Sequence, residues 1–503
     1  MAKVDTNSIA LAFADEDSPA VWETIELNTP DNYGAELTTV PREPISEDLQ
    51  NRKGVPTDLT SGLGFQTDTT MSLLRSFVRR YVMAIYRGAK EYVPSVTSTT
   101  AFTVDNVTTA TLVPRTLVYA RGMGVSSNNG LKTVGVASTT TSVVVTESLV
   151  EESTVPTAAS LRVAGLVGAV GDLSITVTGS EVKLVSATAN LFKAAASVDE
   201  VFDLIPGMAV FIGGTNAVNK FSTDANFGYA LIKSVSDDGT EITLINTTAQ
   251  FVTDAGAGQQ VHVYFGKTSR NVSVSHADFY RKTLDFELAF QNLEAIGTAA
   301  YEYAEKNLCN EWTLNVPLTN KSTSGMTFIG TDAKPPIVTR RAGASTPTRP
   351  QLVQAISTAI DIGRLRLAEV DTLGTQVDFK NLTMTLTRNI SAEKSISNLE
   401  AIGLNLGRLG VTYDAQMIYS DKSISEAIRN NLSFSLDFSL RNDDGAAHFT
   451  SPSVTLGDGG RDFPVNESVL INTTITAFGD PVEFDTTLMV TLFPWVPKTD
   501  NQT

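Results

Sequence analysis

Apolar and polar side chains alternate along much of the chain after Val272, which is the pattern of a β-strand with one buried face. In residues 311–334 every second side chain of the first run is apolar, at positions Trp312, Leu314, Val316 and Leu318. The polar run 319–325 then turns the chain, and apolar residues return at 326–329 before a Pro-Pro break. This segment predicts a β-hairpin with a long loop.

The same alternation recurs downstream, with turn residues between the runs. The predicted strands cover residues 382–386, 411–417, 432–440, 469–478 and 484–492. Many short strands at this spacing, with few helices between them, are typical of a β-sandwich or barrel. The sequence therefore predicts an all-β fold with one or two short helices.

Helical periodicity is strongest over residues 69–85, where apolar side chains recur every three to four positions and predict an amphipathic helix. Its arginines Arg75, Arg79 and Arg80 lie off the apolar stripe. They are expected on a solvent-exposed face, with an intersubunit contact as the alternative.

Two shorter helices are predicted further along the chain. One covers residues 295–308, with small and aromatic residues turned inward. The other, SEAIRN, follows Ser423, which together with Glu426 has the spacing of a capping box. The SEAIRN helix fits a crossover between sheets.

The first 62 residues are polar and contain four prolines, so they predict an extended arm with few regular elements. Such an arm is either a flexible terminus or a segment that becomes ordered against a neighbouring subunit. In the second case Trp22 would anchor it.

Residues 106–267 are rich in Val, Thr and Gly, and two parts of this region share one order of signals. Each has a Gly-Met pair, at Gly122 and Gly207, followed by a Lys-containing strand, a turn, a Val/Ile-rich strand and a closing Val-x-Val pattern. This order predicts a weak internal duplication of a small β module. The expected organisation is an arm (1–62), the start of the core with its helix (63–108), module one (109–166), a connecting segment (167–200), module two (201–268) and the remainder of the core (269–503).

Charge and cysteine content narrow the classes of function. With 55 acidic and 38 basic residues the net charge is −17, which argues against a basic nucleic-acid-binding surface. Cys309 is alone, so an intrachain disulfide and a cysteine-clustered metal site are excluded. An acidic N-terminus and the absence of a run of ~20 apolar residues predict a soluble chain made in the cytoplasm, without a membrane span.

The sequence gives little support for a catalytic site. His262, His276 and His448 have no ligand spacing and are expected to be neutral, hydrogen-bonded structural residues. The segment ending in Gly266-Lys267-Thr268 lacks the first glycine of a phosphate-binding loop. We therefore expect no catalytic, cofactor or metal site, although a pair of carboxylates brought together by the fold, as in a glycosidase, stays open.

Several segments together resemble one known family. They are NRKGVPTDLTSGLGF (51–65), YEYAEKN (301–307), LNVPLTNKSTSGMTFIGTDA (314–333), STAIDIGRLRL (357–367), TRNISAEKSISNLEAIG (387–403), EAIRNN (426–431), FPWVP (493–497) and, inside the insert, PGMAVFIGG (206–214) and NFGYALIKSV (226–235). In this order they are similar to the major tail tube proteins of tailed bacteriophages, specifically those of long-tailed, non-contractile, siphovirus-type phages.

The resemblance implies a β-sandwich flanked by a helix and assembled as six-membered rings whose inner strands close into one β-barrel. Stacked rings would form the tube through which the DNA genome is ejected. The implied partners are further copies of the chain, the tape measure protein, the tail terminator and the tail-tip or baseplate proteins, with no cofactor and no membrane. The implied location is the virion tail, assembled in the host bacterial cytoplasm.

Within this family an acidic lumen would repel duplex phosphates and let DNA slide. Four acids in predicted strands are the candidates for lumen-facing residues: Asp285, Glu287, Asp414 and Asp437. An outward, solvated position is the alternative for each of them. The two inserted modules would lie outside the ring, which favours a tail without a sheath.

Two other classes of function stay open. One is a surface or secreted β-sandwich adhesin, or a phage decoration protein, whose small modules bind carbohydrate. The other is a polysaccharide hydrolase on a jelly roll.

Overall fold

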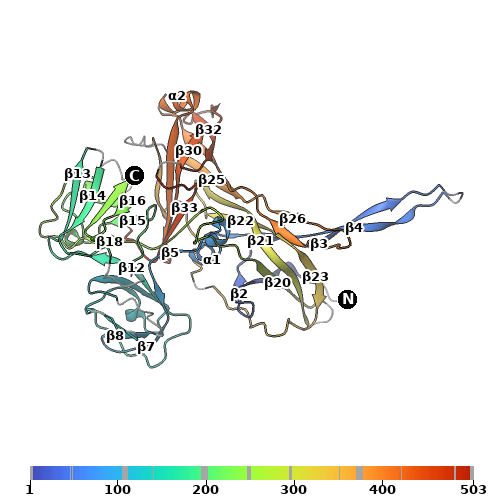
Figure 1. Cartoon of the computed structure of the whole chain (residues 1–503), viewed down its shortest axis with the longest axis horizontal. Coiled ribbons are helices and arrows are strands. Elements are labelled where there is room, and N and C mark those ends of the chain that lie inside the picture. The colour runs from blue at the N-terminus through green and yellow to red at the C-terminus, as the bar shows by residue number, and fades with distance from the viewer. Residues whose placement is uncertain are drawn as a thin grey trace.

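The computed structural model of the chain describes residues 4–498, apart from 46, 48, 105–111, 137, 140, 180, 194–201, 246–250, 294–296, 351, 370–377, 421 and 481–482. Within these residues nearly all regular structure is antiparallel strand, joined by two α-helices and four short 3-10 turns (Figure 1). The prediction of an all-β fold is therefore confirmed.

The core and the insert are separate regions of Figure 1. The core strands are β1 (Ile9–Asp15), β2 (Trp22–Ile25), β3 (Thr29–Arg42), β4 (Arg52–Asp68), β5 (Arg87–Gly88), β19 (Lys267–Arg270), β20 (Leu284–Gln291), β21 (Ala299–Pro317), β22 (Thr323–Gly330), β23 (Asp332–Ile337), β24 (Ile362–Glu369), β25 (Phe379–Thr387), β26 (Ser391–Glu393), β27 (Gly403–Asn405), β28 (Gly410–Ile418), β29 (Ser433–Asn442), β30 (Gly445–Leu456), β31 (Gly460–Asp462), β32 (Leu470–Ala477) and β33 (Met489–Phe493), with helices α1 (Met71–Val82) and α2 (Ser423–Asn430) and turn η1 (Thr6–Ser8). The insert holds β6 (Glu91–Tyr92), β7 (Pro94–Thr97), β8 (Ala101–Val104), β9 (Thr116–Arg121), β10 (Gly130–Thr133), β11 (Ser142–Val144), β12 (Ser160–Val167), β13 (Leu173–Thr178), β14 (Glu181–Ser186), β15 (Ala209–Ile212), β16 (Gly228–Val235), β17 (Glu241–Ile245) and β18 (His262–Tyr264), with turns η2 (Ser126–Asn128), η3 (Ala217–Asn219) and η4 (Asp224–Asn226).

The core has two layers. In the first, which we call the front sheet, strands pair in the order β3–β4–β22–β21–β25–β28–β32, and the end of β30 and β31 pair with β32. The second, the back layer, contains β1, β20, β23, β24, β29 and β33 together with the first parts of β21 and β30. One large apolar cluster, which includes Trp312, Phe328 and Phe438, fills the space between the layers.

Strand β21 connects the layers because it pairs in both of them. Its first part pairs with β20 and β23, whereas residues from Leu308 onward pair with β22 and β25. Lys306, which has φ +51°, lies where the partners change. The alternating hairpin predicted from residues 311–334 is confirmed, with Trp312, Leu314 and Met326 buried. Its loop is shorter than predicted, because β22 already begins at Thr323; Leu318 is exposed in the turn, and the expected Pro-Pro break lies within strand β23.

The helix predicted over residues 295–308 is wrong. Residues 294–296 lie outside the described part, and from Ala299 onward this segment is strand β21. Its Ala and Glu residues favour a helix locally, but backbone pairing on both sides, with β20 and β23, outweighs that weak preference.

The N-terminal 62 residues are more regular than the predicted arm with few regular elements, since β1, β2, β3 and the start of β4 lie within them. Trp22 is fully buried and its ring lies edge-on to that of Tyr303, with the centroids 5.9 Å apart. Trp22 therefore packs inside its own chain, because β1 pairs with β20 and β2 with β1.

The two remaining helix predictions are confirmed in position and corrected in detail. The Thr70 hydroxyl caps α1 by accepting a hydrogen bond from Leu73 N, and the buried Phe77 and Tyr81 face the core. Arg80 is only 6% exposed, so its predicted solvent-exposed position is wrong. Helix α2 begins after Lys422, which has helical backbone angles and makes no side-chain capping bond, so Ser423 is inside the helix rather than its cap.

The insert contains a sheet in the order β10–β9–β12–β18–β15–β16–β17–β14–β13, with β6 beside β12. The two predicted modules share this sheet through the β12–β18 pair. Outward from that pair, module one continues with β12, β9 and β10, and an isolated bridge then joins Val134 to Val145. On the other side module two continues with β18, β15, β16 and β17, so both modules have the same strand order.

The insert also packs on the core. A small cluster joins Phe211 and Tyr229 of the insert to Met489 and Phe493 of β33. The ring of Tyr229 stacks on that of His448 in β30, with the centroids 4.8 Å apart.

An ion pair joins the N-terminal strand to α1. Arg80 Nη2 lies 2.5 Å from Asp15 Oδ2, and Tyr280 also donates to this carboxylate at 3.1 Å. Burial acts to raise the pKa of Asp15, but the charge and hydrogen bond of Arg80 outweigh it, so the pKa is lowered from its ordinary 3.8. The carboxylate therefore stabilises the fold above that pH, and this contribution is lost as the pH falls through the lowered value.

We predict that Asp15→Asn lowers the free energy of unfolding by about 3 kcal/mol, because the buried Arg80 would lose the carboxylate with which it forms its ion pair. Urea unfolding at pH 7 measures the effect. Asp17→Asn is the matched control, because the Asp17 side chain is half exposed and pairs with Lys282 at the surface. Equal stability of the two variants would contradict the structural role given to Asp15.

Candidate functional site

The front sheet has one buried and one polar face. Side chains at alternate positions point away from the core, and they define what we call the polar face: Gln66, Glu311, Thr313, Asn315, Thr323, Thr327, Thr383, Thr385, Thr387, Thr412, Asp414, Gln416, Asn472, Thr474 and Thr476. Among these residues Glu311 and Asp414 are the charged side chains, and both are acids. At the margins of the same face the register adds Asp31, Asp68 and Asp462, of which Asp68 is paired with Lys321 at 2.8 Å.

Strand register aligns the polar face into continuous rows. One row passes through Gln66, Gly325, Thr313, Thr385, Thr412 and Thr476, each paired with the next across neighbouring strands. β-branched Thr suits a pleated surface, and its hydroxyl keeps that surface hydrated. The rows therefore form a broad, nearly uncharged wall.

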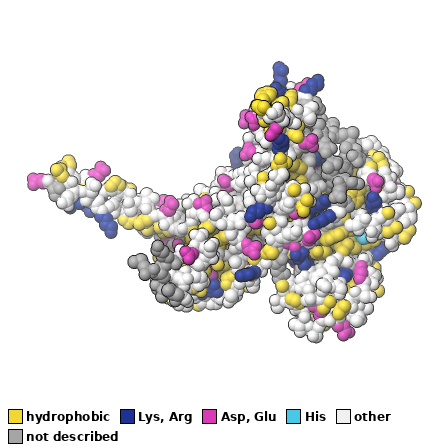
Figure 2. Space-filling view, turned by 180° about the vertical axis from the view of Figure 1, so that it is seen from behind, with side chains coloured by type: hydrophobic (Ala, Val, Ile, Leu, Met, Phe, Trp, Pro, Cys, Tyr) yellow, Lys and Arg dark blue, Asp and Glu magenta, His cyan; other side chains and the backbone are white. Residues whose placement is uncertain are grey.

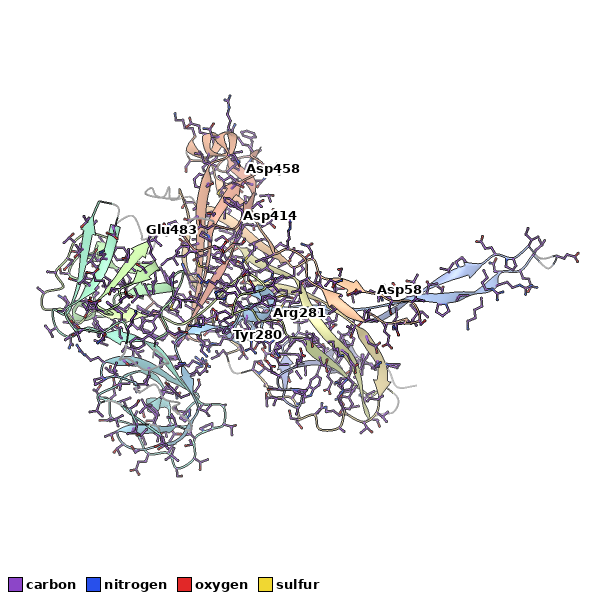
Figure 3. The ribbon with its side chains drawn as sticks, viewed as in Figure 1. Asp58, Tyr280, Arg281, Asp414, Asp458 and Glu483 are labelled. Carbon is purple, nitrogen blue, oxygen red and sulfur yellow. The ribbon has the colours of Figure 1, made fainter. Side chains whose placement is uncertain are left out.

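Two open hollows lie on this face. One, of about 340 Å³, lies over β4, β22 and β21 and is lined by Asp31, Glu311 and neighbouring polar residues. The other, of about 330 Å³, lies over β25, β28 and β32 and includes Asp414 and Asp458. Figure 3 shows these two acids on the same part of the core. Neither lining contains a Lys, Arg or His.

Both lateral edges of the front sheet are open in the described chain. On one side β3 pairs with β4 alone, and on the other β31 pairs with β32 alone. Open edges of this kind present unpaired N–H and C=O groups that another strand can satisfy. The polar face is therefore bounded by two strands able to accept further partners.

The β3–β4 hairpin extends far beyond the sheet (Figure 1). Figure 2 shows it projecting clear of the molecule, with apolar, basic and acidic side chains along it. Leu37, Val40 and Val55 are each about half exposed there. Its base is fixed by Lys394, which pairs with Asp58 at 2.6 Å and donates to Leu59 O.

The four acids predicted as lumen candidates are not brought together. Asp414 is exposed on the polar face, where it accepts a hydrogen bond from Thr474 at 2.8 Å. Asp285 and Glu287 lie on β20 of the back layer, and Asp437 lies on β29. Of the four, only Asp414 belongs to the polar face.

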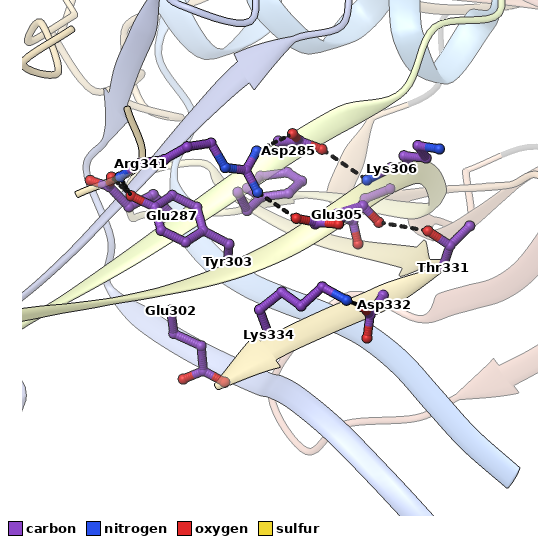
Figure 4. Close-up of polar contacts among 12 residues, drawn as sticks. Asp285, Glu287, Glu302, Tyr303, Glu305, Lys306, Thr331, Asp332, Lys334 and Arg341 are labelled. Atoms are coloured by element: carbon purple, nitrogen blue, oxygen red, sulfur yellow. Dashed lines mark hydrogen bonds and ion pairs between the residues drawn. The ribbon is translucent and has the colours of Figure 1, made fainter. Parts of the chain in front are cut away.

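The back-layer acids are paired with arginines (Figure 4). Asp285 lies 2.8 Å from Arg341 and accepts from Lys306 N. Glu287 is 1% exposed, 3.0 Å from Arg340, and accepts from the Tyr303 hydroxyl at 2.7 Å. Burial raises the pKa of Tyr303 to about 12, so it remains a donor at neutral pH.

Asp437 is also 1% exposed and lies 3.2 Å from Arg366. Assembly only buries surface further, so Glu287 and Asp437 have no route to a lumen in this fold, and their proposed lumen position is corrected. The polar parity of β29 is itself buried: the Ser439 hydroxyl lies 2.7 Å from His448, which stacks under the insert. Alternation therefore identified the strand but not what covers its polar side.

The histidines make hydrogen bonds of a structural kind. His262 Nδ1 lies 2.9 Å from the Tyr264 hydroxyl, and burial lowers the His262 pKa to about 4. His276 Nδ1 accepts from Asp278 N at 3.0 Å. In the described part of the chain no three His, Cys, Asp or Glu side chains are grouped so as to hold a metal ion.

Comparison with known proteins gives one family. A family model described as phage tail tube protein matches residues 6–491. No curated protein matches the chain. None of the described helices has the length and apolar character that crossing a membrane requires.

We predict opposite results for two aspartates. Asp437→Asn should lower the free energy of unfolding by about 3 kcal/mol, because Arg366 loses a buried counter-charge. Asp414→Asn should change it by less than about 0.5 kcal/mol, because its side chain is exposed. Denaturant unfolding of both variants measures this difference, and a destabilised Asp414→Asn would contradict the exposed position.

We further predict that Cys309 does not react with an aromatic disulfide reagent in the native protein at pH 8. The thiol is buried, and burial raises its pKa to about 12, so little nucleophilic thiolate forms. One thiol should react after unfolding in guanidinium. Rapid labelling of the native chain would show that the core around β21 opens readily.

Proposed function

This chain belongs to the phage tail tube protein family, and on that premise we propose that its copies close into rings and stack into the hollow conduit through which phage DNA is ejected. The observation that carries this proposal is a polar sheet face bounded by an open edge on either side. The family resemblance implies six-membered rings.

The open edges support ring closure. Identical copies joined head to tail, the edge of one against the opposite edge of the next, pair every strand and leave no free margin. The front sheet of each copy then becomes a segment of one continuous barrel. Its polar face lies inside, because the other face is already buried against the back layer.

The chemistry of the polar face supports passage of DNA. A basic wall would bind phosphates with release of counterions and hold the duplex. Thr, Asn and Gln side chains with scattered acids offer no such attraction, and the acids Glu311, Asp414 and Asp458 repel the duplex backbone. Asp414 remains the lumen candidate of the original four, and Asp285 is kept only as a partly exposed back-layer acid paired with Arg341.

The hairpin and the insert suggest the remaining contacts. The β3–β4 hairpin projects beyond its own sheet with half-exposed apolar side chains, which suits contact with an adjacent ring. The insert packs on the back layer, opposite the polar face, and would stand outside the tube. An outer decoration of this size favours a sheathless, siphovirus-type tail.

The remaining partners follow from the family. The tape measure protein would occupy the lumen during assembly, and terminator and tip proteins would close the two ends. The chain would be assembled in the host bacterial cytoplasm and reside in the virion tail.

Electron microscopy of the overexpressed chain tests the proposal. Hollow cylinders of uniform width, formed alone or with a tip complex as initiator, are expected. Discrete oligomers that retain glycans would instead support the adhesin alternative, and a sheath around the tube in virions would overturn the sheathless assignment.

We predict that the double variant Thr313→Lys with Thr385→Lys still forms tubes but slows DNA ejection at least tenfold at low salt. The two residues are cross-strand partners on the polar face, so each copy would add two cations to the lumen. Fluorescent measurement of DNA release from triggered virions gives the rate, and added salt should restore it.

The matched control is Thr313→Gln with Thr385→Gln, which adds similar length without charge. Unchanged ejection by the Lys variant, with tubes of normal length, would show that these residues do not line the path of DNA.

A further inference from the structure

The core of this chain contains the same arrangement twice. The first copy, unit 1, is formed by β1, β3, β4, α1, β20, β21, β22 and β23. The second, unit 2, is formed by β24, β25, β28, α2, β29, β30 with β31, β32 and β33. Each series is given in chain order, and members at the same place in the two series correspond.

Every pairing in unit 1 has its equivalent in unit 2. In unit 1 the pairs are β1–β20, β20–β21, β21–β23, β21–β22, β22–β4 and β4–β3. In unit 2 they are β24–β29, β29–β30, β30–β33, β30–β32, β32–β28 and β28–β25. Six antiparallel pairings thus recur in the same topological order.

Other details of the two units agree. The helix follows the second strand of the front-sheet hairpin in both, α1 after β4 and α2 after β28. Strands β21 and β30 each begin in the back layer and end in the front sheet. The insert interrupts unit 1 between β5 and β19, which hides the repeat along the chain.

The chain therefore contains one example of a unit-to-unit contact. Strand β21, the last strand of unit 1 in the front sheet, pairs with β25, the first strand of unit 2, from Glu311 opposite Thr387 to Pro317 opposite Asn381. The equivalent last strand of unit 2 is the end of β30 with β31, and the equivalent first strand of unit 1 is β3. These are the two open edges of the front sheet.

The stagger between the units matches a closed barrel. Strand β4 ends at Asp68 before α1, and β28 ends at Ile418 before α2. When these two strand ends are aligned, Gln66 is equivalent to Gln416. The row through Gln66 nevertheless reaches β28 at Thr412, four residues earlier. Four residues of stagger over four strands correspond to a strand tilt of about 35°, within the range of closed β-barrels.

We propose that each chain supplies two consecutive units of the tube wall, so that a ring of six units contains three chains, and that neighbouring chains join by pairing β31 of one copy with β3 of the next. The proposal rests on the proposed function for the existence of the ring. It makes every joint around the ring alike, because the joint between chains repeats the β21–β25 joint within a chain.

The equivalence also gives the register of the joint between chains. Asn315 pairs with Thr383 inside the chain. Asn315 is connected through Thr323 to Asp68, and Asp462 is connected through Leu470 to Ile418, so the alignment of Asp68 with Ile418 makes Asn315 correspond to Asp462. Thr383 pairs with Asp414, whose equivalent Gly64 pairs with Asp31, so Thr383 corresponds to Asp31. Asp462 of one copy should therefore lie opposite Asp31 of the next, and both side chains are exposed in the single chain.

The test is disulfide cross-linking in assembled tubes. The double variant Asp31→Cys with Asp462→Cys is made in a Cys309→Ala background, and it removes a like-charged pair from the joint, so it should not weaken assembly. After mild oxidation a non-reducing denaturing gel should show a ladder that ends at three chains. The single variants Asp31→Cys and Asp462→Cys are the controls and should give no ladder.

Each other outcome overturns a defined part of the proposal. A ladder that ends at six chains would exclude the three-chain ring. Intact tubes without cross-links would exclude the β31–β3 joint. A reconstruction of wild-type tubes in which six insert domains rather than three surround each ring would, like the six-chain ladder, exclude the three-chain ring. If the wild-type chain formed no tube even with an initiator, the proposed function itself would fail.

Discussion

Backbone pairing on both sides of β21 is the constraint on which the rest of the molecule depends. This strand hydrogen-bonds to β20 and β23 in the back layer and then to β22 and β25 in the front sheet. Buried backbone groups must be paired, so one strand sets the spacing of the layers and the register between the two halves. Trp312, fully buried at its centre, packs against Tyr81 of α1 and Phe449 of β30 and joins both halves in one core.

The sequence predicted the positions of single strands better than it predicted which other parts of the chain cover them. Alternation located β21, β22, β25, β28 and β29 because each has at least one face in the core. It could not show that Ser439, on the polar side of β29, is buried against His448, on which Tyr229 of the insert stacks, since Tyr229 lies about 200 positions away in the sequence. For the same reason Glu287 and Asp437 resembled solvent-facing acids: their partners Arg340 and Arg366 are brought close only by the fold. The residues that do form the polar face, Thr313 and its neighbours, were visible as the other parity of the first hairpin.

The repeat within the core was hidden for a different reason. The two units share pairing order and not residue pattern: unit 1 begins its front sheet with a long projecting hairpin, whereas the matching strands of unit 2 are joined through the small β26–β27 pair. Topology is fixed by which backbones pair, and many side-chain patterns satisfy it equally. The duplication that the sequence did suggest, inside the insert, was the one where the two copies still share short motifs.

The points at which the insert joins the core are close together. The chain leaves through β5 and returns through β19, and these strands pair directly, Gly88 opposite Lys267. A domain whose two ends lie side by side can be exchanged for another without altering the path of the host strands. The condition is that the replacement domain also buries Met489 and Phe493, which the present insert covers. The insert is thus attached at a point where the chain tolerates a change of domain while the core strands keep their pairing.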